Sequence, residues 1–214
     1  MYYKKLVDIP SLPDDLKQDL IEAAHKVFAE NQENRILYHR MFEKEDKTTL
    51  NYMGDEDMDF YEKSGGVTAM AMPDELHQRV YEFYKQADRP ITNLFEYYGF
   101  LFVEGGPYCA PHIDDVVRRR NGFQLLLKSG GERVTTAWWE PKEEFKDLSL
   151  KDYCGVPYSK INKVTEVCLE ENFWHWMKFD SLHSVENQES IRIFLVGGKE
   201  GVGDFTSTIE EIYD

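Results

Sequence analysis

From residue 97 onward the sequence is a series of short segments rich in β-branched, aromatic and aliphatic residues. Turn-forming residues separate these segments, as in Gly105-Gly106-Pro107 and Ser129-Gly130-Gly131. One short strand buries little apolar surface by itself, so a succession of them must close into a sandwich or barrel. The predicted strands are 97–103, 108–113, 123–127, 133–139, 164–169, 173–179 and 191–196.

The first 90 residues have a different pattern. Leu16, Leu20 and Ala24 recur at helical spacing and predict an amphipathic helix over 12–30, while Pro73 opens a second helix. Strands are expected at 34–42 and 67–72, and the polar, acidic stretch 43–66 is expected to be a loop. The sequence therefore predicts a mainly β fold with flanking α. This is a double-stranded β-helix, a jelly-roll or cupin-type barrel, with N-terminal helices packed outside it.

No repeat, low-complexity tract or linker divides the chain, so a single domain over 1–214 is expected. Residues 1–90 form its helical and strand support, 91–197 the barrel core and 198–214 a C-terminal tail. The charged insertion 141–171 is expected to be mostly loop or short helix between barrel strands.

The net charge is −15, from 25 Lys and Arg against 40 Asp and Glu, and this opposes general nucleic-acid binding or binding to an anionic membrane. The N-terminus lacks a signal-type apolar segment, and no apolar run reaches membrane-spanning length. The 3 cysteines lack Cys-x-x-Cys spacing, which fits free thiols. These features predict a cytoplasmic protein, and they leave its oligomeric state open.

The stretch Pro111-His112-Ile113-Asp114-Asp115 places an imidazole and a carboxylate two residues apart. In an extended strand, His112 and Asp114 project from the same face, whereas Asp115 faces away. His183 supplies a second imidazole downstream. Two histidines and one carboxylate on one face of a metal ion leave its other positions open, an arrangement typical of non-haem Fe(II) oxygenases.

Arg192 lies between Ile191 and Ile193 in an apolar strand. A guanidinium is expensive to bury without an anionic partner, and its fork can hold a carboxylate through two hydrogen bonds. A ligand carboxylate is the favoured partner. The structural alternatives are an ion pair with a barrel Asp or Glu, or exposure on an edge strand.

Four motifs together resemble the Fe(II)- and 2-oxoglutarate-dependent dioxygenase superfamily, particularly its compact prolyl-hydroxylase-like members. They are Pro111-His-Ile-Asp114, Ser129-Gly-Gly-Glu132, Phe179-Asp-Ser-Leu-His183-Ser-Val and Arg192-Ile-Phe-Leu, and the resemblance covers roughly 97–197. It implies that His112, Asp114 and His183 bind Fe(II), and that Arg192 binds the remote carboxylate of 2-oxoglutarate.

The resemblance also implies dioxygen as cosubstrate, with ascorbate as the reductant in vitro. The implied reaction is hydroxylation of an unactivated carbon, with succinate and CO2 as coproducts. The substrate is an amino acid, a small metabolite or a residue of a peptide or protein. Halogenating relatives carry a small residue where this chain has Asp114, which favours hydroxylation or a related oxidation.

Further candidates surround this set. Gln124 can hydrogen-bond the cosubstrate, and the hydroxyl that assists Arg192 in the family has four candidates here, which are Thr135, Thr136, Tyr98 and Tyr108. Phe102 stands where prolyl-hydroxylase-like relatives often have Tyr. Arg118 and Arg120 can clamp an anionic substrate or form a solvated loop, and Trp138 and Trp176 can line the substrate site or belong to the core.

Two other functions fit the same ligands. The first is a cupin-like protein or degenerate oxygenase relative that binds a metal or small anion without turnover, which the missing Tyr at Phe102 favours. The second is a metal-dependent isomerase, but the extra histidine or Glu ligand that such enzymes use is not evident near His112.

Overall fold

The structure is a computed structural model that describes residues 1–31, 36–39, 63–87, 97–104, 106–113, 121–146 and 156–198. Two β-sheets face each other, and all strand pairings within them are antiparallel. The seven-stranded sheet has the order β1-β9-β6-β11-β4-β3-β2, and the four-stranded sheet has the order β5-β10-β7-β8. The predicted double-stranded β-helix is confirmed.

The strands of the seven-stranded sheet are β1 (Tyr3–Leu6), β2 (Ile36–His39), β3 (Val67–Ala71), β4 (Tyr97–Val103), β6 (Asn121–Lys128), β9 (Trp174–Lys178) and β11 (Arg192–Gly198). Those of the smaller sheet are β5 (Tyr108–His112), β7 (Thr135–Pro141), β8 (Ile161–Val167) and β10 (His183–Glu186). Two 3₁₀ turns, η2 (Glu143–Phe145) and η3 (Tyr158–Lys160), lie between β7 and β8.

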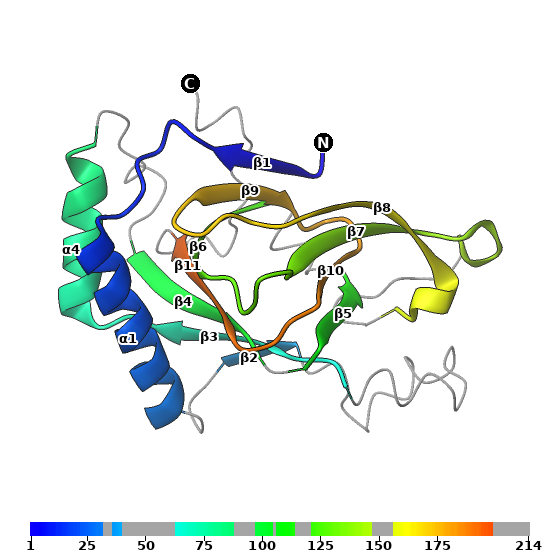
Figure 1. Cartoon of the computed structure of the whole chain (residues 1–214), viewed down its shortest axis with the longest axis horizontal. Helices are drawn as coiled ribbons and strands as arrows, with labels where there is room; N and C mark the ends of the chain where they lie inside the picture. The colour runs from blue at the N-terminus through cyan, green and yellow to red at the C-terminus, as the bar shows by residue number, and fades with distance from the viewer. Residues whose placement is uncertain are drawn as a thin grey trace.

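Two helices cover the outer face of the larger sheet. Figure 1 shows α1 (Asp14–Glu30) and α4 (Asp74–Lys85) together on one side, with the four-stranded sheet on the other. Each helix follows a proline and has two acidic residues in its first turn, where carboxylates interact favourably with the helix dipole. The helices therefore lie outside the barrel, as predicted.

Side-chain alternation in the larger sheet separates two apolar cores. On β4, Phe100 and Phe102 face the helices, whereas Leu101 and Val103 face the smaller sheet. On β11, Ile193 faces the helices, and Phe194 belongs to the core between the sheets. A residue must lie on this second, inner face to contribute to a site inside the barrel.

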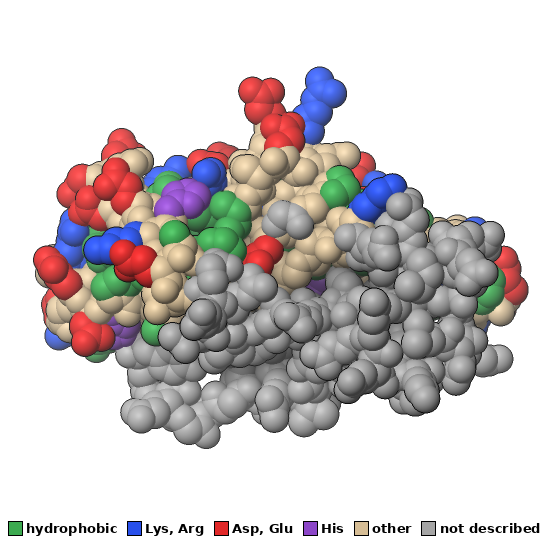
Figure 2. Space-filling model, turned by 90° about the horizontal axis from the view of Figure 1, so that it is seen from below, with side chains coloured by type: hydrophobic (Ala, Val, Ile, Leu, Met, Phe, Trp, Pro, Cys, Tyr) green, Lys and Arg blue, Asp and Glu red, His purple; other side chains and the backbone are tan. Residues whose placement is uncertain are grey.

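The surface over the helices is charged. Figure 2 shows acidic and basic side chains interspersed at the end of the molecule that the helices occupy. Of the helices that the structure describes, none is long and apolar enough to cross a bilayer.

Several predicted boundaries were wrong. Two strands were not predicted at all, β1 and β10, and the second of these begins at His183. The insertion 141–171 contains η2, η3 and the whole of β8, which starts at Ile161 rather than Val164. Of the strand expected at 34–42, the structure describes Ile36–His39, and these residues form β2; most of the predicted loop 43–66 lies outside the described residues. The single domain stays a prediction.

Candidate metal centre

The two candidate histidines lie side by side at the end of the four-stranded sheet. His112 is the last residue of β5 and His183 the first residue of β10, and the strand register pairs them directly. Their ring centroids are 4.4 Å apart, with 53° between the ring planes. Both side chains are buried, at 3% and 5% exposure. Residues far apart in the chain thus present two imidazoles to one point.

Backbone carbonyls orient both rings. Nδ1 of His112 donates to the carbonyl of Ala110 at 2.7 Å, and Nδ1 of His183 donates to the carbonyl of Ser181 at 3.0 Å. Because a carbonyl oxygen can only accept, the proton of each neutral ring lies on Nδ1. The lone pair is then on Nε2, and this tautomer, set by a backbone hydrogen bond, is one that metal-binding histidines commonly adopt.

The predicted third ligand lies outside the described residues. Strand β5 ends at His112, and the structure describes Ile113 but not Asp114. Within the described ranges there is no group of three or more His, Cys, Asp or Glu side chains that could hold a metal ion. The ligand triad of His112, Asp114 and His183 therefore stays a prediction, with two of its members brought together.

Arg192 is the most deeply buried charge of the described chain. Its side chain has 0% exposure at the start of β11, and Nη1 donates to Oγ1 of Thr136 at 3.1 Å. Within the described residues, Nε and Nη2 have no hydrogen-bond partner. The ion pairs that the structure records there join other residues. The guanidinium thus has two donors left for an acceptor that the protein does not supply there.

Burial of this guanidinium is energetically unfavourable. Burial lowers the pKa of Arg192 to about 9 from its ordinary value of 12.5. The ring of Phe194 lies against the guanidinium, with Cζ 4.9 Å from the ring centroid, and contributes a weak attraction. A bound anion would compensate the buried charge far better.

The strand register places Arg192 close to the histidines. Thr136, which accepts its hydrogen bond, pairs with Val185 on β10, and two residues along each strand Trp138 pairs with His183. Diagonal neighbours of this kind have Cα atoms about 7–8 Å apart. Both Thr136 and His183 point toward the larger sheet, so the anion site and the histidine pair share the space between the sheets.

Gln124 and His175 lie deeper on the inner face. They pair across β6 and β9, on the side of the larger sheet that faces the smaller one, and the contact of Gln124 with the cosubstrate stays a prediction. His175 accepts from the hydroxyl of Tyr3 at Nδ1 (3.2 Å) and donates from Nε2 to the carbonyl of Glu170 (2.8 Å). Burial lowers the pKa of His175 to about 4, so this ring is neutral near pH 7. Its two hydrogen bonds indicate a structural role.

The other predicted site residues have mixed positions. Trp138 lies beside His183, but it is fully buried and its Nε1 donates to the carbonyl of Lys178 at 2.9 Å, so it forms a wall behind the site. Trp176 packs in the helix-facing core, the wrong face for the predicted substrate contact. Tyr108 pairs with Glu186 and packs against Tyr158 at a centroid distance of 5.9 Å, and its contact with the cosubstrate stays a prediction. Arg118 and Arg120 lie outside the described residues.

The hydroxyl partner of Arg192 is Thr136, one of four sequence candidates. Phe102, whose lack of a hydroxyl left this partner in doubt, packs against Phe28 of α1 at a centroid distance of 4.9 Å and faces the helices. The residue that sequence reasoning missed is Phe179, whose ring centroid lies 5.0 Å from that of His183. Its place in the same motif, four residues before His183, was the available signal.

No family model matches this chain, and no curated protein matches it. A Pseudomonas putida prolyl-4-hydroxylase is 15% identical with a TM-score of 0.43, over 91% of this chain and 90% of the other. A prolyl hydroxylase of Trichoplax adhaerens, in complex with a hypoxia-inducible-factor peptide, is 11% identical with a TM-score of 0.43, over 96% and 87%. The 2-oxoglutarate-dependent epimerase SnoN from nogalamycin biosynthesis is 11% identical with a TM-score of 0.48, over 90% and 76%.

By their names, these solved proteins have different reactions, hydroxylation and epimerisation, yet their scores against this chain are similar. Likeness at this level concerns the fold and carries no information on substrate or reaction.

Proposed function

We propose that this protein is an Fe(II)- and 2-oxoglutarate-dependent oxygenase. The observation that carries the proposal is Arg192, a fully buried guanidinium with two unpaired donors in the described structure, which shares one interior with the pair His112 and His183. A metal-binding pair beside an unneutralised buried cation suits a ligand that is both a chelator and an anion.

The residues fit this cosubstrate chemically. Nε2 of His112 and of His183, with the carboxylate of Asp114, would hold Fe(II), and Arg192 with Thr136 would hold the remote carboxylate of 2-oxoglutarate. A five-carbon dicarboxylate built on C–C bonds of about 1.5 Å extends roughly 5 Å from end to end. That length is compatible with the strand spacing between Thr136 and His183. When bound, Fe(II) and 2-oxoglutarate supply the oxidising chemistry with dioxygen.

The chain's own contribution is to bind, orient and exclude water. The carbonyls of Ala110 and Ser181 fix the two imidazoles, and Phe179 and Trp138 surround His183 with apolar surface. Exclusion of water strengthens each electrostatic contact inside the site, including that of Arg192 with an anion. The protein itself fully buries the guanidinium of Arg192, so its donors are shielded from water on all sides that the protein covers.

For the reaction we propose hydroxylation of an unactivated carbon of an amino acid, a small metabolite or a residue of a peptide or protein. The carboxylate at Asp114 supports this choice over halogenation. Arg118 and Arg120 follow the metal motif directly and are candidates for binding an anionic group of the substrate. We propose a cytoplasmic location, from the free-thiol composition.

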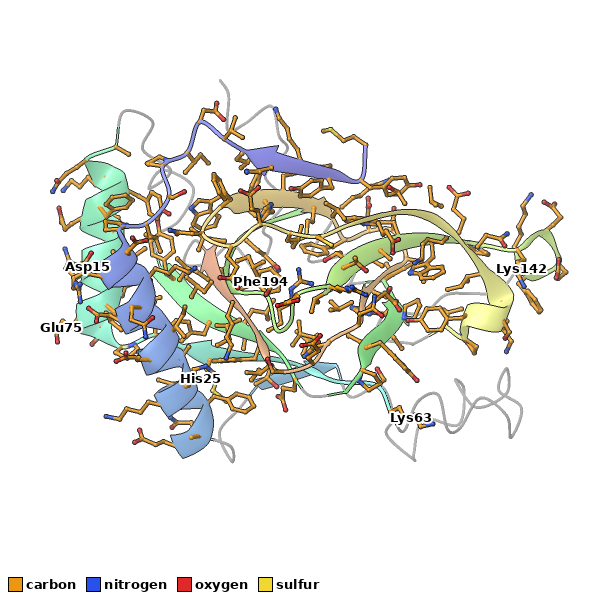
Figure 3. All side chains as sticks on the ribbon, viewed as in Figure 1. Asp15, His25, Lys63, Glu75, Lys142 and Phe194 are labelled. Carbon is orange, nitrogen blue, oxygen red and sulfur yellow. The ribbon has the colours of Figure 1, made fainter. Side chains whose placement is uncertain are left out.

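The test is 2-oxoglutarate consumption and succinate formation by the purified protein with Fe(II), ascorbate and dioxygen. His112→Ala and Asp114→Ala should abolish metal-dependent turnover. His25→Ala is the matched control, because this histidine lies on α1, away from the barrel interior, and contacts Lys128 (Figure 3). Turnover that survives in His112→Ala would refute the proposal, and loss of turnover in His25→Ala would mean that the assay reports on folding.

A further inference from the structure

We infer that Gly122 and Phe179 form a size-matched pair that orients His183 for metal binding. The inference rests on the proposed function, since it assigns His183 as a ligand. Gly122 lies on β6 and Phe179 follows β9, so the pair joins the larger sheet to the loop that leads into β10. Both would be positioning residues, because neither carries a metal-binding atom.

Gly122 is required for its lack of a side chain. Its backbone is outside the left-handed region, so conformational freedom is not the reason for glycine here. A Cβ atom at this position would overlap Cε2 of Phe179 and lie 2.8 Å from Cδ2. Contacts this short require one partner to move, since carbon atoms pack at about 3.5–4.0 Å. The ring of Phe179 therefore occupies the space that any other residue at 122 would fill.

The loop that carries Phe179 is held at both ends. The carbonyl of Lys178 accepts a hydrogen bond from Nε1 of Trp138, and the carbonyl of Leu182 accepts one from the backbone N–H of Trp139, each at 2.9 Å. Both donors belong to β7, in the opposite sheet. A clash at Gly122 cannot be relieved by a shift of the whole loop without breaking these bonds, so the ring of Phe179 must move instead.

Movement of the Phe179 ring would directly affect His183, the proposed metal ligand that it contacts. The centroids of Phe179 and His183 are 5.0 Å apart, with 53° between the ring planes, and Phe179 is buried in the core between the sheets. The same loop supplies the carbonyl of Ser181 that accepts from Nδ1 of His183. Residues 179–182 thus give this imidazole one hydrogen bond and one aromatic contact. Loss of the contact with Phe179 removes apolar support from one side of the ring and disturbs its orientation.

The test compares metal affinity in four purified variants, with Co(II) alone as the probe, by calorimetry and visible absorption. Gly122→Ala should weaken Co(II) binding by at least ~10-fold, the lower range for changes that disturb the support of a metal ligand. The double variant Gly122→Ala/Phe179→Leu should recover part of this loss and match the affinity of Phe179→Leu alone, because the smaller side chain returns the space that the methyl group takes. Phe179→Leu alone should weaken binding several-fold by removing ring contact with His183.

Gly99→Ala is the matched control. Gly99 is also a strand glycine of the larger sheet, where a Cβ would lie 3.1 Å from the carbonyl of Met70, and its strand β4 pairs with β3 and β11 rather than with the histidine strands β5 and β10. Its melting temperature should fall while Co(II) affinity stays within about twofold. Equal affinity in Gly122→Ala and wild type, or no recovery in the double variant, overturns the inference. If Gly122→Ala does not fold, unchanged affinity in Phe179→Leu overturns it. Absence of Co(II) binding by wild type would instead refute the proposed function.

Discussion

Replacement of Arg192 by Met should stabilise the protein without ligand and remove its response to 2-oxoglutarate. Met has a similar length and no charge to desolvate. Burial lowers the pKa of Arg192 from 12.5 to about 9, and at about 1.36 kcal/mol per pH unit this corresponds to a cost of the order of 5 kcal/mol. Because the folded-state pKa lies below that of the unfolded chain, the cost is fully present below about pH 9 and declines as pH rises toward 12.5.

The gain in stability expected for Arg192→Met is smaller than the full cost of burying the guanidinium. Replacement of buried charges by apolar residues of similar volume is typically neutral or stabilising by about 1–4 kcal/mol. For a chain of 214 residues, each kcal/mol shifts the melting temperature by about 2–4 °C. Arg192→Met should therefore melt at the same temperature as the ligand-free wild type or several degrees above it.

Stabilisation by 2-oxoglutarate should differ in the opposite sense, with wild type gaining more than Arg192→Met. With Mn(II) under anaerobic conditions and 2-oxoglutarate at a hundredfold Kd, wild type should gain about 2.7 kcal/mol, or roughly 5–10 °C. Arg192→Met should gain almost nothing from 2-oxoglutarate. Arg79→Met is the control, since Arg79 pairs with Asp19 on the surface and should affect neither measurement by more than about 1 kcal/mol. A strongly destabilised Arg192→Met variant would show that an internal carboxylate pairs with Arg192, and the anion-site reasoning would fail.

Three further changes test the surrounding contacts. Thr136→Val removes the oxygen that accepts from Arg192 and should raise the KM for 2-oxoglutarate by roughly 5- to 10-fold with kcat unchanged; equal KM values in steady-state kinetics would contradict the assignment of Thr136. Tyr158→Phe removes the hydroxyl that donates to the carboxyl of Glu186 and should lower the free energy of unfolding in urea by about 1–3 kcal/mol; an unchanged transition midpoint argues against that contact. Burial raises the pKa of Glu186, so stability from this group is present at low pH and falls as pH rises from 4.5 through the raised folded-state value. Glu186→Gln should flatten this fall at pH values above 4.5, and an identical pH profile would exclude the raised pKa.

The barrel could be predicted because most of its strands either alternate apolar and polar residues or form short apolar runs. Strand β4 was predicted with the bounds that the structure has. Strand β10 was missed because His183, Ser184 and Glu186 are polar, although the first two are buried. Pairing with the neighbouring strands β5 and β7 stabilises such a strand, and its own residues show no hydrophobic pattern that would predict it.

The members of the site could be predicted better than their contacts. The pairing of His112 with His183 and the burial of Arg192 agree with the expectations from the motifs. Thr136 could not be distinguished from other hydroxyl residues, because its contact with Arg192 joins two sheets whose register the sequence does not specify.

The sequence also could not predict on which face of its sheet an aromatic residue lies. Trp138 and Trp176 both follow strand alternation, yet one lies beside His183 and the other faces the helices. The larger sheet is covered on both sides, so apolar residues on its two faces are equivalent in the sequence. Gly122 shows the same limit, because its role depends on the ring of Phe179 from a distant loop.

The central claim is that one interior binds Fe(II) and 2-oxoglutarate together, with Arg192 as the anchor. The most direct measurement is anaerobic addition of Fe(II), then 2-oxoglutarate, to the metal-free protein, followed by visible absorption for the metal-to-ligand charge-transfer band of a chelated 2-oxo acid. We expect the band in wild type and a sharp loss of its intensity in Arg192→Met at the same 2-oxoglutarate concentration. Tight Fe(II) binding by wild type without the band would contradict the account.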